Sequence, residues 1–140
     1  MNIFLDTDIL LDFLGDRRPF SKFALALFKE AENNDLKLYT SANSITTTYY
    51  ILTKLSTEKN ARTLITELLD VLWIIQVDKG ILKLAFSSEF KDVEDSVQHY
   101  AALASGNIEF IVTRNLRDYK LSLLPVVGPE EMVNRLGLQI

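Results

Sequence analysis

The chain has 140 residues, of which 48% are hydrophobic and 24% charged, which is typical of one globular domain and excludes an intrinsically disordered chain. It has no cysteine and one histidine, which excludes disulfide scaffolds, thiol catalysis and cysteine-bound zinc and argues against a histidine-based site. The net charge of −4 argues against broad nonspecific binding to nucleic acid, and no apolar run approaches the ~20 residues that a membrane span needs. Asp6, Asp8 and Asp12 interrupt the apolar residues at the amino terminus, so we expect no secretory leader there. We therefore expect a single cytoplasmic domain over residues 1–140.

Short apolar runs alternate with amphipathic helical patterns in the first half of the chain. Residues 2–5 predict a buried strand, and a helical pattern begins directly after Asp6. Pro19 suits the start of a second helix, which we expect residues 33–35 to end. The next elements are a short strand at 36–40 and helices at 41–55 and 57–72.

The same alternation continues in the second half. Asp78 caps a short helix, and Asp92 opens a longer helix that the Ser-Gly-Asn sequence at 105–107 closes. The remaining elements are strands at 73–77, 110–113 and 125–127, a polar loop at 114–120 and a last helix near Pro129. Parallel strands need crossover connections, which are usually helices, so the alternation predicts an α/β fold with a mostly parallel sheet.

Three segments place acids or their polar relatives where strands are expected to end at one edge of this sheet. Open α/β sheets bind their ligands at that edge, and Mg²⁺ prefers oxygen ligands that include one or two carboxylates. In nucleases such an ion activates water and polarises a phosphoryl oxygen. The candidate ligands are Asp6 with Asp8 behind it, Asp92 with Asp95, and Asn115 with Asp118.

Each of these side chains also has a purely structural interpretation. Asp6 and Asp92 suit helix N-caps, and Asp95 suits the positive end of a helix dipole. Asn115 and Asp118 are typical turn formers, whose side chains bond to nearby backbone amides. Taken one at a time, the residues leave both interpretations open.

Four other polar residues lie close to the candidates in sequence. We expect Glu94 to point elsewhere as a solvated acid, and Asp12 and Asp16 to be ordinary surface or turn residues. His99 follows Asp95 by one helical turn, so it could line the same site. We expect this histidine to be a partly exposed partner of the acid rather than a catalytic group.

Three ordered segments resemble the motifs of PIN domains. They are Leu5-Asp6-Thr7-Asp8-Ile9-Leu10, Asp92-Val93-Glu94-Asp95-Ser96-Val97-Gln98 and Ile111-Val112-Thr113-Arg114-Asn115-Leu116-Arg117-Asp118-Tyr119. The resemblance implies a three-layer α/β/α fold around a mostly parallel central sheet of four to five strands. Many PIN domains are magnesium- or manganese-dependent ribonucleases, and bacterial single-domain members include the toxins of VapBC toxin–antitoxin pairs. The resemblance therefore implies RNA as substrate, an antitoxin protein as partner, and a homodimer, since family members commonly pair.

Residue by residue, the resemblance assigns Asp6 to the first acidic position of the family and Asp95 to the third. Asn115 aligns best with the fourth acid, and Asp118 is a nearby carboxylate that can substitute or assist. We therefore expect catalytic roles for Asp6, Asp95, Asn115 and Asp118, and metal ligation by the three aspartates. Supporting or substrate contacts are expected from Thr7, Thr47, Asp92, Thr113, Arg114 and His99.

The departure from the family pattern is at the second acid. The family has a glutamate shortly after a Ser-Ala pair, but here Ser41-Ala42 leads into residues 43–50 without any acid, and Thr47 is the best match. A hydroxyl can bind a metal-held water but brings no charge, so metal affinity should be weakened. Two functions remain: a metal-dependent ribonuclease, or a degenerate PIN domain that binds RNA or a protein partner without cutting. Basic residues beside the motifs, Lys91, Arg114 and Arg117, could hold phosphates or be solvated loop charges.

Overall fold

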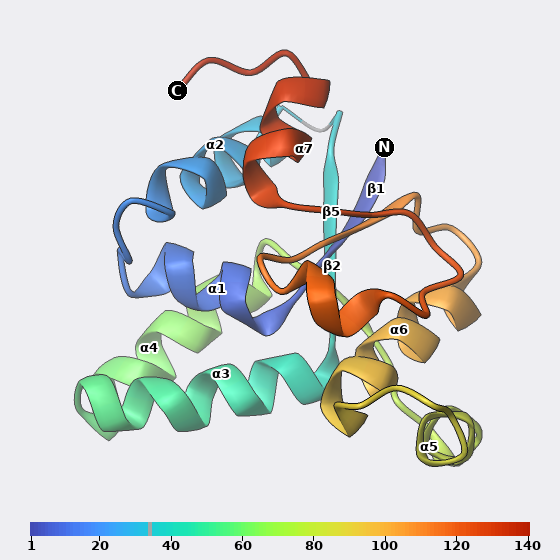
Figure 1. Ribbon diagram of the computed structural model, residues 1–140. Helices are drawn as coiled ribbons and strands as arrows, with labels where there is room; N and C mark the ends of the chain where they lie inside the picture. The colour runs from blue at the N-terminus through green and yellow to red at the C-terminus, as the bar shows by residue number, and fades with distance from the viewer. Residues whose placement is uncertain (34) are drawn as a thin grey trace.

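A parallel sheet forms the centre of the protein in the computed structural model, which describes residues 1–33 and 35–140 (Figure 1). The strand order is β3-β2-β1-β4-β5, and every neighbouring pair runs parallel. The strands are β1 (Asn2–Leu5), β2 (Lys37–Ser41), β3 (Trp73–Ile75), β4 (Phe110–Val112) and β5 (Val126–Val127). The first strand therefore lies in the middle of the sheet, as its continuous apolar run predicted.

Helices connect the strands and cover both faces of the sheet. They are α1 (Thr7–Leu14), α2 (Ser21–Ala31), α3 (Ala42–Leu55), α4 (Glu58–Leu69), α5 (Lys79–Phe86), α6 (Val93–Ser105) and α7 (Pro129–Arg135), with a 3₁₀ turn η1 (Leu116–Tyr119). Among the described helices, none has both the length and the apolar character that crossing a bilayer requires.

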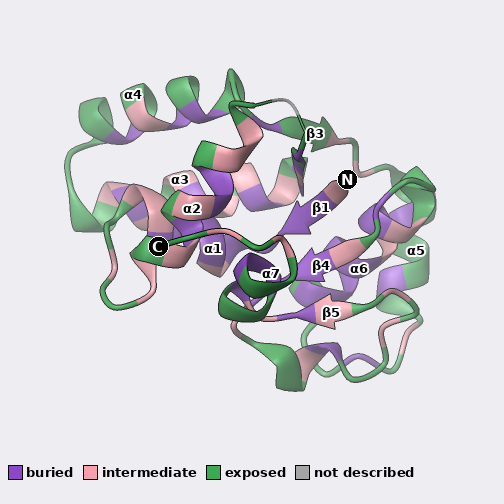
Figure 2. Ribbon diagram, turned by 90° about the horizontal axis from the view of Figure 1, so that it is seen from above, coloured by how far each residue is buried: buried purple, intermediate pink, exposed green. Residues whose placement is uncertain are grey.

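Successive residues of β1 point to opposite faces of the sheet and so define the two sides of the core. Ile3 and Leu5 pack in a cluster with side chains of α1, α2, α4 and α7, whereas Phe4 packs on the other side with Ala102 of α6 and Tyr119 of η1. Ile3, Phe4 and Leu5 are all fully buried in the middle of the sheet (Figure 2). The three-layer α/β/α fold with a parallel sheet is therefore confirmed.

Several element boundaries differ from the predictions. The helix expected from Pro19 begins at Ser21, and the strand expected over 73–77 ends at Ile75 and is an edge strand with exposed Trp73. The loop at 114–120 contains η1, and the helix expected over 57–72 ends at Leu69. In the segment expected to end the second helix, Asn34 lies outside the described residues.

The topology brings the ends of β1 and β4 together. The Asp6 N–H donates to the Val112 carbonyl at 3.0 Å, and the Thr113 N–H donates to the Val127 carbonyl at 3.0 Å. Asp6 and Thr113 thus lie at the carboxyl edge of the sheet, where open α/β folds bind ligands.

Candidate metal centre

Asp6 is both a helix cap and a buried acid at the sheet edge. Its Oδ1 accepts a hydrogen bond from the Thr7 N–H and its Oδ2 accepts one from the Thr113 hydroxyl, both at 2.8 Å. The side chain is almost fully buried, and burial raises the pKa of Asp6 while these hydrogen bonds oppose the rise. The capping interpretation is thus realised for one oxygen, and each oxygen keeps a further lone pair for another partner.

Three aspartates from two segments converge beside this edge. One carboxylate oxygen from each of Asp92, Asp95 and Asp118 lies within 4.8 Å of the other two. Asp92 caps α6, since its Oδ1 accepts from the Asp95 N–H at 3.1 Å. Burial, followed by the charges of Asp6, Asp92 and Asp118, raises the pKa of Asp95 to about 8. The structure therefore brings together Asp95 and Asp118 as expected and adds Asp92 to the same group of oxygens, while Asp6 acts on Asp95 through its charge.

Asn115 lies against Asp118 at the start of η1. Its Nδ2 donates to Asp118 Oδ2 at 2.5 Å, and its backbone N–H donates to the Thr113 hydroxyl at 3.0 Å. The Thr113 hydroxyl therefore connects Asn115 with Asp6 Oδ2 through consecutive hydrogen bonds. The side chain that aligns with the family's fourth acid orients a neighbouring acid here.

The donor set fits a divalent cation. Asp95 Oδ2 and Asp8 Oδ1 are buried and have no hydrogen-bond partner among the described residues. Burial and the charge of Asp6 raise the pKa of Asp8 to about 6. A buried carboxylate oxygen without a partner is unfavourable, and an ion held by Asp92, Asp95 and Asp118 would satisfy Asp95 Oδ2 and compensate the clustered negative charge.

Glu94 is the first correction to the sequence interpretation. Its side chain is exposed, as expected of a solvated acid, but it does not stand apart from the site, because its charge contributes to raising the pKa of Asp6. Burial and the charge of Asp92 raise the pKa of Glu94 itself. A fourth carboxylate of the two motif segments thus acts on Asp6 through its charge.

Asp12 is the second correction. It is fully buried rather than at the surface, and it accepts hydrogen bonds from Arg17 Nε at 2.9 Å and from Arg114 Nε and Nη2 at 2.8 and 2.9 Å. The Arg114 guanidinium also stacks on the Phe20 ring, with Cζ 3.8 Å from the centroid. The Arg114 backbone N–H donates to Asp8 Oδ2 at 2.9 Å. Arg114 therefore fastens the segment after β4 to α1, a role that its position in the motif did not reveal.

His99 is the third correction. The ring is fully buried, where we expected partial exposure, and its Nε2 accepts a hydrogen bond from the Leu123 N–H at 2.9 Å. Burial lowers the pKa of His99, and no carboxylate contributes to that shift. Because Nε2 is an acceptor, the ring is neutral with its proton on Nδ1. This histidine supports the 121–123 segment and is not a partner of Asp95.

Two residues that sequence reasoning did not assign complete the surroundings. The Gln98 side chain is fully buried and accepts from the Ser41 hydroxyl while donating to the Ser44 hydroxyl. Thr7 joins this network through a 3.1 Å hydrogen bond from its hydroxyl to Ser44. Polar residues on the inward-facing turn of a helix next to apolar ones, such as Gln98 beside Val97, are a signal for such a network.

Tyr119 is the second unassigned residue. Its hydroxyl is buried with no hydrogen-bond partner among the described residues. Burial, then the charges of Asp6 and Asp95, strongly raises the pKa of Tyr119, so the hydroxyl stays protonated. A neutral hydroxyl therefore faces the two acids of the site.

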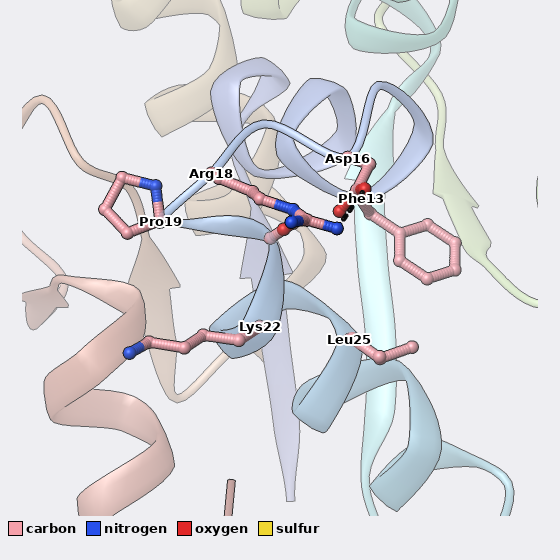
Figure 3. Close-up of a pocket in the computed structure, with 7 residues that line it drawn as sticks. Phe13, Asp16, Arg18, Pro19, Lys22 and Leu25 are labelled. Atoms are coloured by element: carbon pink, nitrogen blue, oxygen red, sulfur yellow. Dashed lines mark ion pairs between the residues drawn. The ribbon is translucent and has the colours of Figure 1, made fainter.

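A basic groove adjoins the acidic cluster. A pocket of about 260 Å³ is lined by Asp118 and by the three cationic side chains of Lys91, Arg117 and Lys120. Its other lining residues are Glu89, Phe90 and Leu121. A separate hollow of about 600 Å³ lies beside the turn between α1 and α2, where Arg18 pairs with Asp16 at 3.6 Å next to Phe13 and Leu25 (Figure 3). Only the first of these two joins positive charge to the candidate metal ligands, so it is the better candidate for a phosphate-binding groove.

Comparisons with known proteins agree with this geometry. A family model described as PIN domain matches residues 2–117. Ribonuclease VapC1 of Aquifex aeolicus is 32% identical over 109 residues, which cover 74% of this chain and 75% of that protein.

Solved structures show the same fold at low sequence identity. A chain of VapBC2 from Rickettsia felis, bound to a DNA fragment from their promoter, gives a TM-score of 0.65 at 16% identity and covers 91% of this chain and 98% of that chain. The sarcin-ricin loop cleaving toxin VapC20 of Mycobacterium tuberculosis gives 0.60 at 15% identity, with 78% and 86% covered. Since the family model spans most of the sequence, the chain belongs to the PIN domain family.

Proposed function

We propose that this protein is a divalent-cation-dependent endoribonuclease of the VapC type. The observation that carries the proposal is the carboxylate cluster of Asp92, Asp95 and Asp118, in which the buried Asp95 Oδ2 has no hydrogen-bond partner among the described residues. The 32% identity to a protein named ribonuclease VapC1 supports the same reaction. Phosphodiester hydrolysis of RNA is therefore the activity that the site suits best.

The chain's own residues would hold the divalent ion and hydrogen-bond to the anionic oxygens around it. Asp95, Asp92 and Asp118 would hold Mg²⁺ or Mn²⁺, and Asp6 contributes charge from a position that Thr113 fixes. When bound, such an ion polarises a phosphoryl oxygen and lowers the pKa of water. The protonated Tyr119 hydroxyl can act only as a donor toward nearby anionic oxygens.

RNA would be bound through its phosphates. Lys91, Arg117 and Lys120 line the groove next to Asp118, so a strand lying there would bring a phosphate to the acidic cluster. The overall charge of −4 leaves this groove as a local positive feature, which favours contact at the site over nonspecific coating.

The protein partners form the finer part of the proposal. An antitoxin is supported by the solved structures of VapBC2 and of a toxin–antitoxin complex from Klebsiella pneumoniae, which share the fold. Large apolar side chains at the surface, such as Tyr50 at 60%, Trp73 at 54% and Phe86 at 70% exposure, suit contacts with an antitoxin or a second copy of the chain. An activity on cellular RNA would be exerted in the cytoplasm, which is the compartment that we propose.

Cleavage of a labelled RNA with Mg²⁺, Mn²⁺ or excess EDTA tests the function. We expect cleavage with a metal, none in EDTA, and none by Asp6→Asn or Asp95→Asn, while Asp70→Asn at the exposed end of α4 cleaves like the wild type. RNA binding without cleavage in every metal would instead support the non-cleaving alternative.

A further inference from the structure

One buried amide joins three segments that meet at the carboxyl edge of the sheet. Gln98 of α6 is fully buried, and its Oε1 accepts a hydrogen bond from the hydroxyl of Ser41 at the end of β2. Its Nε2 donates to the hydroxyl of Ser44 in the first turn of α3 and lies 3.5 Å from the hydroxyl oxygen of Thr7 at the start of α1. The Gln98 side chain therefore ties α6 to the starts of α1 and α3.

The same hydrogen bonds lead from Gln98 to Asp6. The Thr7 N–H donates to Asp6 Oδ1 at 2.8 Å, and the Thr7 hydroxyl donates to Ser44 Oγ at 3.1 Å. Ser44 is fully buried and accepts hydrogen bonds from both Thr7 and Gln98. A continuous chain of contacts thus runs from Asp6 through Thr7 and Ser44 to Gln98.

Gln98 extends this chain to the acids of α6. It follows Asp95 by three residues, so the two side chains lie on one face of the helix, and both are buried. Ser96, which lies between them in sequence, donates instead to a backbone carbonyl of α5 at 3.3 Å. The contact of Gln98 with Ser44 therefore relates the helix that carries Asp95 to the strand end that carries Asp6.

A fully satisfied buried amide opposes movement of the segments that it joins. A shift of α6 that separates Gln98 from the two serines would leave buried polar groups without partners, which is unfavourable. An apolar side chain of similar length could fill the same space, but it would not favour one position of the helix over another. Because Mg²⁺ requires short bonds in near-octahedral geometry, small displacements between its carboxylate ligands weaken its binding.

We propose that Gln98 is a positioning residue of the cation site: its amide, through Ser44 and Thr7, fixes the helix that carries Asp95 relative to Asp6. This inference rests on the proposed function, since it assigns a residue to the same site. Gln98 does not bind the ion itself, because its oxygen and its nitrogen already bond to the two serine hydroxyls. The affinity of the site then depends on a neutral amide that contributes no charge to it.

Titration with Mn²⁺ alone, with the free ion followed by electron paramagnetic resonance, tests the proposal without RNA. Gln98→Met keeps the length of the side chain and removes the amide. It should raise the dissociation constant by about 10-fold, the low end for groups that support metal ligands, because Gln98 acts through intervening residues. Ser44→Ala removes the hydroxyl that Gln98 and Thr7 share and should also weaken binding. Alanine favours the helix, so this second variant tests the proposal even if Gln98→Met does not fold.

The matched control is Thr48→Val, one turn after Ser44 on α3. The Thr48 hydroxyl is fully buried and donates to the Ser44 carbonyl at 2.6 Å, within the same helix. Its loss should lower the thermal unfolding midpoint in EDTA, but Mn²⁺ should bind as in the wild type because no contact between segments is removed. Gln76→Met, at an exposed glutamine, should change neither quantity. A merely structural Gln98 would behave like Thr48, with a lower midpoint and unchanged affinity of the folded protein.

Affinities are compared well below the unfolding midpoint of every variant. The proposal is overturned if folded Gln98→Met or Ser44→Ala binds Mn²⁺ like the wild type, or if Thr48→Val loses as much affinity as Gln98→Met. Asp95→Asn separates this result from the proposed function. Loss of binding in Asp95→Asn without any change in Gln98→Met and Ser44→Ala refutes only the positioning role, whereas a wild type that does not bind Mn²⁺ refutes the cation site itself.

Discussion

Replacing Asp12 by alanine should destabilise the fold more than any exposed acid would. Its carboxylate is fully buried and accepts three hydrogen bonds from the guanidinium groups of Arg17 and Arg114. Removing one partner of a buried ion pair typically costs about 3–5 kcal/mol. Because Arg17 and Arg114 keep 39% and 28% of their side-chain surfaces exposed and can rehydrate, we expect the lower end, about 3 kcal/mol.

Urea unfolding in EDTA measures this difference, with Glu131→Ala as the control. Glu131 also pairs with an arginine, Arg135 at 2.9 Å, but both side chains are more than half exposed, so its loss should cost no more than about 0.5 kcal/mol. Equal losses in the two variants would refute the conclusion that Asp12 is a buried anchor. Since Arg114 fastens the segment that carries Asn115, Asp12→Ala should also reduce RNA cleavage.

Three further predictions concern the acids, the hydroxyl and the groove. Burial and neighbouring charges raise the folded-state pKa of Asp95 from 3.8 to about 8. Between these two values the metal-free folded protein holds a proton that the unfolded chain has released, so the free energy of unfolding should fall as the pH rises from about 4 to about 8. Asp95→Asn should flatten this pH dependence in urea unfolding with EDTA. A slope that is the same in Asp95→Asn would exclude this residue as its source. Tyr119→Phe removes a buried hydroxyl without a full hydrogen bond, so calorimetric unfolding should show no loss of stability, or a gain of up to about 1 kcal/mol; a large loss would mean that the hydroxyl is bonded in the folded protein. Changing Lys91, Arg117 and Lys120 together to glutamine should weaken RNA binding. The slope of log affinity against log salt concentration should become smaller by about 2, as expected for the loss of three single-strand phosphate contacts. An unchanged slope would mean that the RNA binds elsewhere.

The sheet and its first acid follow from local sequence. The apolar run 3–5 could be assigned to a central strand because it has no polar face, and Asp6 directly after it had to lie at the carboxyl edge. The exposed edge strand at Trp73 has a similarly apolar sequence, so periodicity alone did not distinguish it from a buried strand. The catalytic and metal-binding roles of Asp6, Asp95, Asn115 and Asp118, and the single-domain organisation, stay predictions.

The directions of Glu94 and Asp12 could not be derived locally. Helical spacing separates Glu94 from the face of Asp95, but the effect of its charge on Asp6 depends on how α6 packs beside the end of β1. The burial of Asp12 depends on Arg114, which is 102 residues further along the chain. Both are consequences of tertiary packing between distant segments, for which a single sequence carries no pairing signal.

The cation site itself is tested most directly by Mn²⁺ titration of the wild type, Asp95→Asn and the control Asp70→Asn, with the free ion followed by electron paramagnetic resonance. We expect saturable binding by the wild type and by Asp70→Asn, and none at millimolar Mn²⁺ by Asp95→Asn, because Asp95 provides the buried unpaired oxygen of the cluster. Undiminished binding by Asp95→Asn, or no saturable binding by the wild type, would contradict the assignment of this edge of the sheet as the metal centre.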